Sequence, residues 1–401
     1  SLVGSEMCIR DSTWAVDYVL LDEKDQILGD TYGYRDHRTD GMDAEVAKIL
    51  PETELYARTG IQKQIFNTIY QLMAVEKKTP EIMKQAKTLL MLPDYFGFRL
   101  TGNKLSEYTN GSTTQLVNPD TFQWDKELIR KLGYPEDIFL PLQMPGTKVG
   151  QLLPEIQKEV GFDLEVVLCG SHDTASAVMA VPQTEGDGIY ISSGTWSLMG
   201  IESLKPVITE DAAAANFTNE GGYDHRFRFL KNIMGLWMIQ SVRHEYNDAY
   251  SFAQLCNMAE ESKEFPSRVD VNDQSFLSPD SMVEAIRQYC HKTGQPVPES
   301  VGELTSVVYR SLAQSYGETV RGLEKIAGKT YDSIHIIGGG SNAAYLNQLT
   351  ADATGKTVYA GPGEATAIGN LLAQMIHAGD LADLKLSLIH ISEPTRLDVI
   401  S

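Results

Sequence analysis

Apolar and polar positions recur along the chain with two different periods, which predict strands and helices. In the first half, the apolar run at 13–21 predicts a buried strand, and a shorter run at 166–168 predicts a second strand that ends at Gly170. The residues between these two runs show mostly helical spacing. Amphipathic helices are expected at 41–50, at 62–75, at 79–92 before Pro93, and at 125–132.

The second half combines a hairpin with alternating strands and helices. Period-2 alternation at 189–192 and 195–199, joined by a tight turn at Ser193 and Gly194, predicts a small β-hairpin. A helix is expected at 227–245. A second helix begins at the capping box of Ser300 and Glu303 and ends at Gly328. Strand and helix then alternate at 334–337, 342–353, 357–360 and 364–377, which predicts an α/β domain.

The end of the strand at 166–168 is the first candidate for chemistry. Asp173 follows this strand closely, and the hairpin tip at Ser193 and Gly194 presents hydroxyl and backbone N–H groups that suit phosphate oxygens. Together they indicate phosphoryl transfer to a hydroxyl, with Asp173 accepting the hydroxyl proton. An Asp before Thr174 can also be a helix N-cap, and the sequence does not decide between these two roles.

Three consecutive glycines, Gly338 to Gly340, follow a predicted strand and precede a helix, so a ligand can approach the backbone closely. Gly338, Gly340 and Ala343 match a relaxed dinucleotide fingerprint, which makes a dehydrogenase a competing hypothesis. That fingerprint needs an acidic residue at the end of the next strand, and 359–362 contains none. We therefore expect nucleotide binding without a nicotinamide.

Length and charge narrow the choice of partner. A chain of 401 residues predicts two domains. Its formal net charge of −20 disfavours nucleic acid and anionic membrane, so the expected partner is a small molecule. No apolar run is long enough to predict a membrane span.

The remaining motifs support no metal, disulfide or hydrolase site. The cysteines have neither C-x-x-C nor metal-ligand spacing, which fits a reducing cytosol, and the histidines lack the spacing of a zinc site, so no metal ligand is assigned. There is no P-loop and no G-x-S-x-G elbow. The four cysteines are Cys8, Cys169, Cys256 and Cys290.

The two ends share a relation at the DNA level. One DNA element that encodes residues 2–12 has a reverse complement that encodes Leu-Ser-Leu-Ile-His-Ile-Ser-Glu-Pro-Thr-Arg, which is the sequence of residues 386–396. Such an element, read in opposite directions at both ends, is typical of an adapter or a transposon end. We therefore expect 1–12 and 386–401 to be adapter-like and leave them out of the fold prediction.

From residue 13 to about residue 385, the chain resembles the FGGY family of carbohydrate kinases. Together the matching stretches are highly specific, although the shorter ones are weak alone. They are 13–22, 34–39, 66–72, 92–96, 107–110, Ser-His-Asp-Thr-Ala-Ser-Ala-Val (171–178), Ser-Ser-Gly-Thr-Trp-Ser-Leu-Met-Gly (192–200), Lys-Asn-Ile-Met-Gly-Leu-Trp (231–237), 338–340 and 346–349.

The resemblance implies two α/β domains of the hexokinase and actin type around a hinged cleft. The expected boundaries are 13–184 for the N-terminal domain, truncated at its start, and 185–385 for the C-terminal domain. Within the family, the motifs are most similar to those of kinases that transfer the γ-phosphate of ATP to O1 of the ketose L-rhamnulose, with Mg²⁺ accompanying ATP. Kinases for fuculose or xylulose, and a non-catalytic sugar-binding relative, are the alternatives.

The resemblance also implies roles for particular residues. Asp173 would be the proton acceptor, and the remaining roles divide between sugar and nucleotide. The sugar would be bound by Ala15, His172, Asp173, Thr174 and Asn232, and ATP by Thr195, Gln240 and Gly339.

The sequence departs from the family pattern at its start. The family opens with a strand and an Asp-x-Gly-type loop that grips phosphates and helps to hold Mg²⁺, and no such loop precedes residue 13. The last family helix is also missing. We therefore expect the chain as given to fold poorly or to lack activity, although we expect the gene from which it comes to encode an active kinase.

Overall fold

The computed structural model describes residues 8–9, 12–182, 188–384 and 398–400. The chain divides into two compact units, and each unit is made of segments that are distant in the sequence. Unit 1 takes the described residues of Ser1–Ala180, Glu202–Phe229 and Thr366–His390, and unit 2 takes those of Val181–Ile201, Leu230–Ala365 and Ile391–Ser401.

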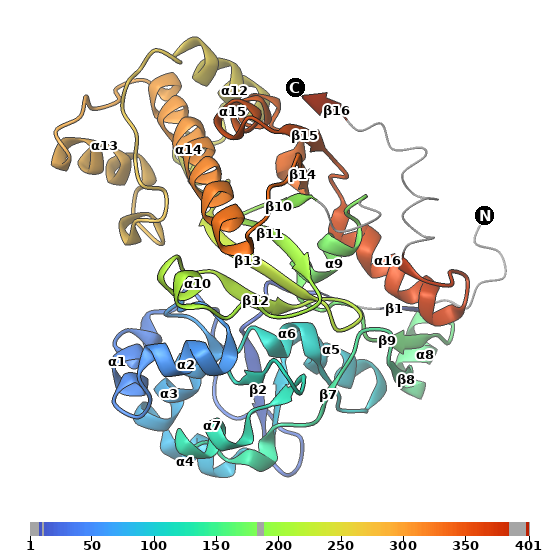
Figure 1. The fold of residues 1–401 in the computed structure, drawn as a ribbon. Coiled ribbons are helices and arrows are strands. Elements are labelled where there is room, and N and C mark those ends of the chain that lie inside the picture. Colours follow the sequence, from blue (N-terminus) through green and yellow to red (C-terminus); the bar gives the residue numbers. More distant parts are fainter. Residues whose placement is uncertain (1–7, 10–11, 183–187, 385–397, 401) are drawn as a thin grey trace. The chain divides into compact units, whose positions relative to one another are not determined.

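Unit 1 combines short strands with many helices (Figure 1). Its strands are β1 Cys8–Ile9, β2 Tyr18–Leu21, β3 Thr88–Met91, β4 Ser106–Glu107, β5 Val117–Asn118, β6 Gln123–Trp124, β7 Leu142–Gln143, β8 Lys148–Gln151, β9 Glu165–Val167 and β12 Thr218–Gly221. Its helices are α1 Met42–Ala47, α2 Glu52–Thr59, α3 Thr68–Lys78, α4 Pro80–Gln85, α5 Leu92–Thr101, α6 Tyr108–Ser112, α7 Lys126–Lys131, α8 Pro154–Val160, α9 Asp173–Met179, α10 Glu210–Ala214 and, apart from its first residue, α16 Ala365–Ala378.

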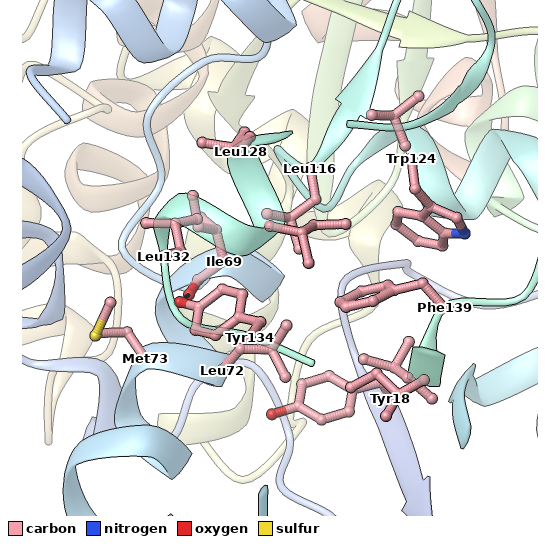
Figure 2. Close-up of a cluster of buried hydrophobic side chains, with 14 of the residues drawn as sticks. Tyr18, Ile69, Leu72, Met73, Leu116, Trp124, Leu128, Leu132, Tyr134 and Phe139 are labelled. Carbon is pink, nitrogen blue, oxygen red and sulfur yellow. Dashed lines mark hydrogen bonds between the residues drawn. The ribbon is translucent and has the colours of Figure 1, made fainter. Parts of the chain in front are cut away.

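A large hydrophobic cluster holds the first part of unit 1 together. β2 pairs with β3 in antiparallel register, with Tyr18 opposite Met91, and all eight residues of the two strands are buried. Figure 2 shows aromatic side chains from distant segments meeting in this cluster, including Tyr18, Trp124 and Phe139. Burial of apolar surface of this extent is the main favourable contribution to folding.

Unit 2 is built on a sheet flanked by helices. Its elements are β10 Ile189–Ser193, β11 Trp196–Ser203, β13 Phe227–Met234, α11 Trp237–Glu245, α12 Phe252–Glu261, α13 Met282–Lys292, α14 Val301–Ala327, β14 Ser333–Ile337, α15 Ala344–Thr354, β15 Thr357–Ala360 and β16 Asp398–Ile400, with the ends of β11 and β13 extending into unit 1.

The unit 2 sheet brings the hairpin beside the α/β segment. Its strand order is β13-β11-β10-β14-β15-β16, in which β10 runs antiparallel to β11 and parallel to β14. The long helix α14 packs against α12 and α15 (Figure 1). Ser300 and Glu303 form the expected capping box at the start of α14, and Gly328 ends the helix in the left-handed conformation, so this prediction is confirmed.

Four secondary-structure expectations were wrong in part. The helix predicted at 62–75 begins only at Thr68, the first residue of α3. The strand predicted at 13–21 covers only Tyr18–Leu21, because Ala15 and Val16 have positive φ angles that turn the chain. The helix predicted at 79–92 is interrupted by β3, and Pro93 lies in the first turn of α5, where its missing N–H costs nothing. The helix predicted at 227–245 begins as strand β13, and helix α11 follows only at Trp237.

The two ends expected to be adapter-like fall mostly outside the described residues. Cys8–Ile9 pairs with β9, and Asp398–Ile400 pairs with β15. Strand pairing uses main-chain N–H and C=O groups, which nearly every residue type provides, so it does not show whether these segments belong to the original protein. Their adapter-like origin therefore stays a prediction. Among the described helices, none is long and apolar enough to cross a membrane.

Candidate active site

Asp173 lies at the start of α9, just beyond strand β9. The N-cap position is held by His172, whose backbone is extended, and Asp173 is the first helical residue. The N-cap alternative for Asp173 was therefore wrong. Its side chain is 45% exposed, and its Oδ1 lies 3.2 Å from Thr174 Oγ1 and 3.5 Å from His172 Nε2. A partly exposed carboxylate with neighbouring donors is suited to accept a proton from a bound hydroxyl.

The segment after Ser12 is joined directly to this helix start. Thr13 donates its N–H to Ser171 O, and Asp173 donates its N–H to Thr13 O, both at 2.8 Å. Ala15 therefore lies two residues after Thr13, the residue that is hydrogen-bonded to Asp173. Thr68 Oγ1 donates to Val16 O at 2.6 Å, which stabilises the strained turn after Ala15.

Trp14 is unusual because 51% of its surface is exposed while its indole N–H is fixed. Trp14 Nε1 donates to Asp17 Oδ2 at 2.7 Å, and Gln71 Nε2 donates to Asp17 Oδ1 at 3.3 Å. Burial raises the pKa of Asp17 above its ordinary value despite these hydrogen bonds. Trp14 therefore does not pack in the hydrophobic core.

His172 contacts two buried charged residues that sequence reasoning missed. Its Nδ1 lies 2.9 Å from Arg228 Nη2 and 3.2 Å from Glu220 Oε2. Burial alone would raise the pKa of Glu220, but its polar contacts, which include the guanidinium of Arg228, lower it below its ordinary value, so the carboxylate is charged at neutral pH. No local motif marks either residue, because β12 and β13 bring them to His172 from a later segment.

The hairpin predicted around Ser193 and Gly194 is confirmed. Ser193 pairs with Ser197, and Gly194 N donates to Trp196 O at 2.8 Å across the turn. Thr195 is exposed at the tip. The segment before α11 contacts this tip, because Leu236 N donates to Gly194 O at 3.0 Å.

The glycine triplet packs against the same hairpin. A Cβ on Gly340 would lie 1.9 Å from Ser193 Oγ, and a Cβ on Gly338 would lie 3.0 Å from Ser193 O. These two glycines therefore allow close packing on β10. Gly339 differs, because a Cβ there would meet nothing within 4 Å.

A large cavity in unit 2 opens beside Gly194 and Gly339. Its volume is about 1060 Å³, which exceeds the ordinary range for small-molecule pockets and is sufficient for a nucleotide. Its lining includes Gln240, Tyr309 and Tyr345. The two tyrosine rings meet edge to face, with centroids 6.1 Å apart, and aromatic surface of this kind suits a nucleobase.

The predicted site residues divide between the two units. Unit 1 brings Ala15, His172, Asp173 and Thr174 to one helix start, and unit 2 holds the others. Gln240 and Gly339 line the cavity. Thr195 is next in the sequence to Gly194, which lines the cavity. Asn232 is partly buried on β13 and does not line the cavity. Within the described ranges, no three His, Cys, Asp or Glu side chains gather to hold a metal ion.

Gly235→Ala should weaken nucleotide binding. A Cβ at Gly235 would lie 2.5 Å from Trp196 C and 2.7 Å from Ser197 N, and neither backbone atom can retreat without moving the hairpin. We expect KM for ATP to rise about tenfold, equivalent to about 1.4 kcal/mol. Initial rates at varied ATP concentrations measure this change in KM. Gly33→Ala is the control, because a Cβ there meets nothing within 4 Å. An unchanged KM for ATP in Gly235→Ala would show that the close packing of Gly235 on the hairpin does not matter for nucleotide binding.

Two stretches of the chain match sequence families of known proteins. Residues 8–180 match the N-terminal domain of the FGGY family of carbohydrate kinases, and residues 189–378 match its C-terminal domain. Three curated relatives named rhamnulokinase match most of the chain. The protein from Halalkalibacterium halodurans is 53% identical over 373 residues, covering 93% of this chain and 79% of that protein. The Oceanobacillus iheyensis protein is 51% identical with the same coverage, and the Bacillus subtilis protein is 45% identical over 96% of this chain and 79% of its own length.

Solved structures agree on the fold. A xylulose kinase from Lactobacillus acidophilus superposes with a TM-score of 0.80 at 18% identity, covering 100% of this chain and 80% of that one. A glycerol kinase from Plasmodium falciparum with ADP gives a TM-score of 0.77 at 15% identity, covering 98% and 79%. The expected two-domain sugar-kinase fold of the hexokinase and actin type is confirmed. The chain belongs to the FGGY family of carbohydrate kinases, enzymes that phosphorylate sugars.

Proposed function

We propose that this kinase transfers the γ-phosphate of ATP to O1 of L-rhamnulose, giving L-rhamnulose 1-phosphate in the breakdown of L-rhamnose. The observation that carries the proposal is the similarity to curated rhamnulokinases at 45–53% identity, which includes the stretch around Asp173. Sugar phosphorylation follows from the family, and the particular ketose is the step that the proposal adds.

Asp173 acts as the base. The O1 hydroxyl of the sugar loses its proton as it attacks the γ-phosphorus, and the carboxylate of Asp173 accepts that proton while ADP leaves. His172 and Thr174 flank the carboxylate and orient the sugar, and the small side chain of Ala15 leaves room for it. We assign Asn232 a further sugar contact.

The nucleotide is assigned to unit 2. Gly339 presents open backbone to the cavity, and Gln240 lines it from α11. Thr195 at the exposed hairpin tip contacts the phosphates through its hydroxyl and backbone N–H. Mg²⁺ bound to ATP would neutralise part of the phosphate charge.

Comparison of sugars tests the substrate. We expect kcat/KM to be highest for L-rhamnulose and about 10- to 200-fold lower for fuculose and xylulose, the range that small differences in a pocket provide. A coupled assay of ADP formation measures the three values. A higher value for fuculose or xylulose would reassign the substrate within the family. Sugar binding without turnover of any ketose would instead indicate a non-catalytic sugar-binding protein.

A further inference from the structure

Three buried polar side chains meet behind Asp173. His172, Glu220 and Arg228 have side-chain exposures of 7%, 6% and 0%. Arg228 Nη2 lies 3.1 Å from Glu220 Oε2, so the two opposite charges form a buried ion pair in contact with the imidazole. Buried charges are costly unless they are paired, so this arrangement needs a role that offsets the cost.

The hairpin that carries the ion pair is held firmly within unit 1. Gly222 N donates to Arg226 O at 2.7 Å, and Gly221 N donates to Ser112 Oγ at 2.7 Å. Arg228 Nε donates to Gly221 O at 2.9 Å, which fixes the plane of the guanidinium. Arg228 is therefore a rigid hydrogen-bond donor.

The contact between Arg228 and His172 determines where the imidazole carries its hydrogen. A guanidinium has donors and no acceptor, so the 2.9 Å contact between Arg228 Nη2 and His172 Nδ1 requires a lone pair on Nδ1. The hydrogen of the neutral ring then lies on Nε2. Glu220 Oε2 also lies 3.2 Å from Nδ1, but this contact does not have the geometry of a hydrogen bond.

We propose that Arg228, paired with Glu220, is a positioning residue that holds His172 as the neutral tautomer with its hydrogen on Nε2. This nitrogen lies 3.5 Å from Asp173 Oδ1, on the side where the sugar is proposed to bind. His172 is then a fixed donor, and Asp173 is the only base at this helix start. The proposal refines the proposed function, because it assumes the role of Asp173 in phosphoryl transfer.

The ion pair offers a matched pair of variants with opposite expectations. In Arg228→Met the donor to Nδ1 is lost and Glu220 becomes the nearest partner, so the hydrogen should move to Nδ1 and point at Glu220. In Glu220→Gln the arginine remains, so the hydrogen should stay on Nε2. Arg228→Lys keeps a cationic donor and should preserve the Nε2–H tautomer if Arg228→Met fails to fold.

Nitrogen-15 NMR of histidine-labelled protein tests the tautomer directly. The signals of His172 are assigned by their loss in His172→Asn, and the one-bond coupling shows which ring nitrogen carries hydrogen. We expect Nε2–H in the wild type and in Glu220→Gln, and Nδ1–H in Arg228→Met. Nδ1–H or a doubly protonated ring in the wild type at neutral pH would overturn the proposal, as would an unchanged tautomer in folded Arg228→Met.

Kinetics separate positioning from general structural support. We expect Arg228→Met to lower kcat by about ten- to a hundredfold, with KM for ATP unchanged, because only the groups beside Asp173 are displaced. Equal loss in Glu220→Gln, which keeps the tautomer, would contradict this explanation. The NMR result does not depend on which sugar is phosphorylated, so an error in the proposed substrate would leave it intact.

Discussion

Asp173→Asn should lower kcat by about 10²- to 10⁴-fold while the dissociation constant for the sugar changes little. The amide has the size of the carboxylate and can still bond to a sugar hydroxyl, but it cannot accept the proton that must leave as the phosphorus–oxygen bond forms. The Asp173 side chain is partly exposed, so the substitution also leaves packing unaffected. A coupled ATP-consumption assay and calorimetric titration of L-rhamnulose measure the two quantities.

Asp30→Asn is the matched control for this experiment. Asp30 is exposed on a loop of the same unit, and the same chemical change there should leave both kcat and sugar binding unaltered. If Asp173→Asn retained turnover within a few-fold of the wild type, another group would have to serve as the base. If the wild type bound sugar without turning it over, there would be no base catalysis to lose.

The position of Asp173 could be predicted because its signals are local. A short apolar run, a glycine and a polar segment lie next to one another in the sequence, and the structure has strand β9 followed by α9 there. The sequence could not decide between base and N-cap, because that choice depends on backbone angles at His172. His172 has φ −74° and ψ 121°, which makes it the last residue before the helix.

The residues around His172 could not be predicted, because they come from a segment that is not local. Glu220 and Arg228 lie on a hairpin that the sequence pattern assigned partly to a helix. Most of β13 is buried, but Arg228, Lys231 and Asn232 divide its apolar residues into short runs. Such short runs do not distinguish a buried strand from a buried helix. The pair Gly221 and Gly222, which precedes this segment, was the one local feature that could have indicated a hairpin.

The glycine triplet shows a different limit of sequence reasoning. Three glycines between a strand and a helix correctly indicated that something approaches the backbone. At Gly338 and Gly340 that neighbour is Ser193 of the hairpin, and only Gly339 is open toward the cavity. A glycine motif therefore predicts close approach, but not whether the approaching group is a ligand or another part of the protein.

Helix α16 supports the helix that begins with Asp173, and a glycine makes this contact possible. A Cβ on Gly369 would lie 1.8 Å from Ser176 O and 2.4 Å from Ser176 C, so the two helix backbones touch (Figure 1). Ser176 Oγ also lies 2.7 Å from Asn370 Oδ1, and Thr366 Oγ1 donates to Asp173 O at 3.3 Å. These contacts hold the start of α9 against α16.

Gly369→Ala should therefore destabilise the protein, although alanine is the better helix former. In an unobstructed helix the change would add about 0.5–1 kcal/mol of stability. Here the methyl group meets backbone, which cannot rotate away, so we expect the free energy of unfolding to fall by about 1–3 kcal/mol or more. Urea denaturation followed by circular dichroism measures this difference, and Leu371→Ala, at a side chain 55% exposed on the same helix, should change it by less than about 0.5 kcal/mol.

The same variant tests whether α16 sets the position of Asp173. Separation of the helices displaces the start of α9, and a small misplacement of a catalytic group can cost up to about 10²-fold in rate. We expect kcat to fall in Gly369→Ala even at temperatures where the variant is fully folded, with KM for ATP unchanged because the cavity lies in unit 2. If Gly369→Ala kept the stability of the wild type, α16 could move away from α9 at little cost. If Gly369→Ala were destabilised but kept the kcat of the wild type, α9 would hold its position without α16.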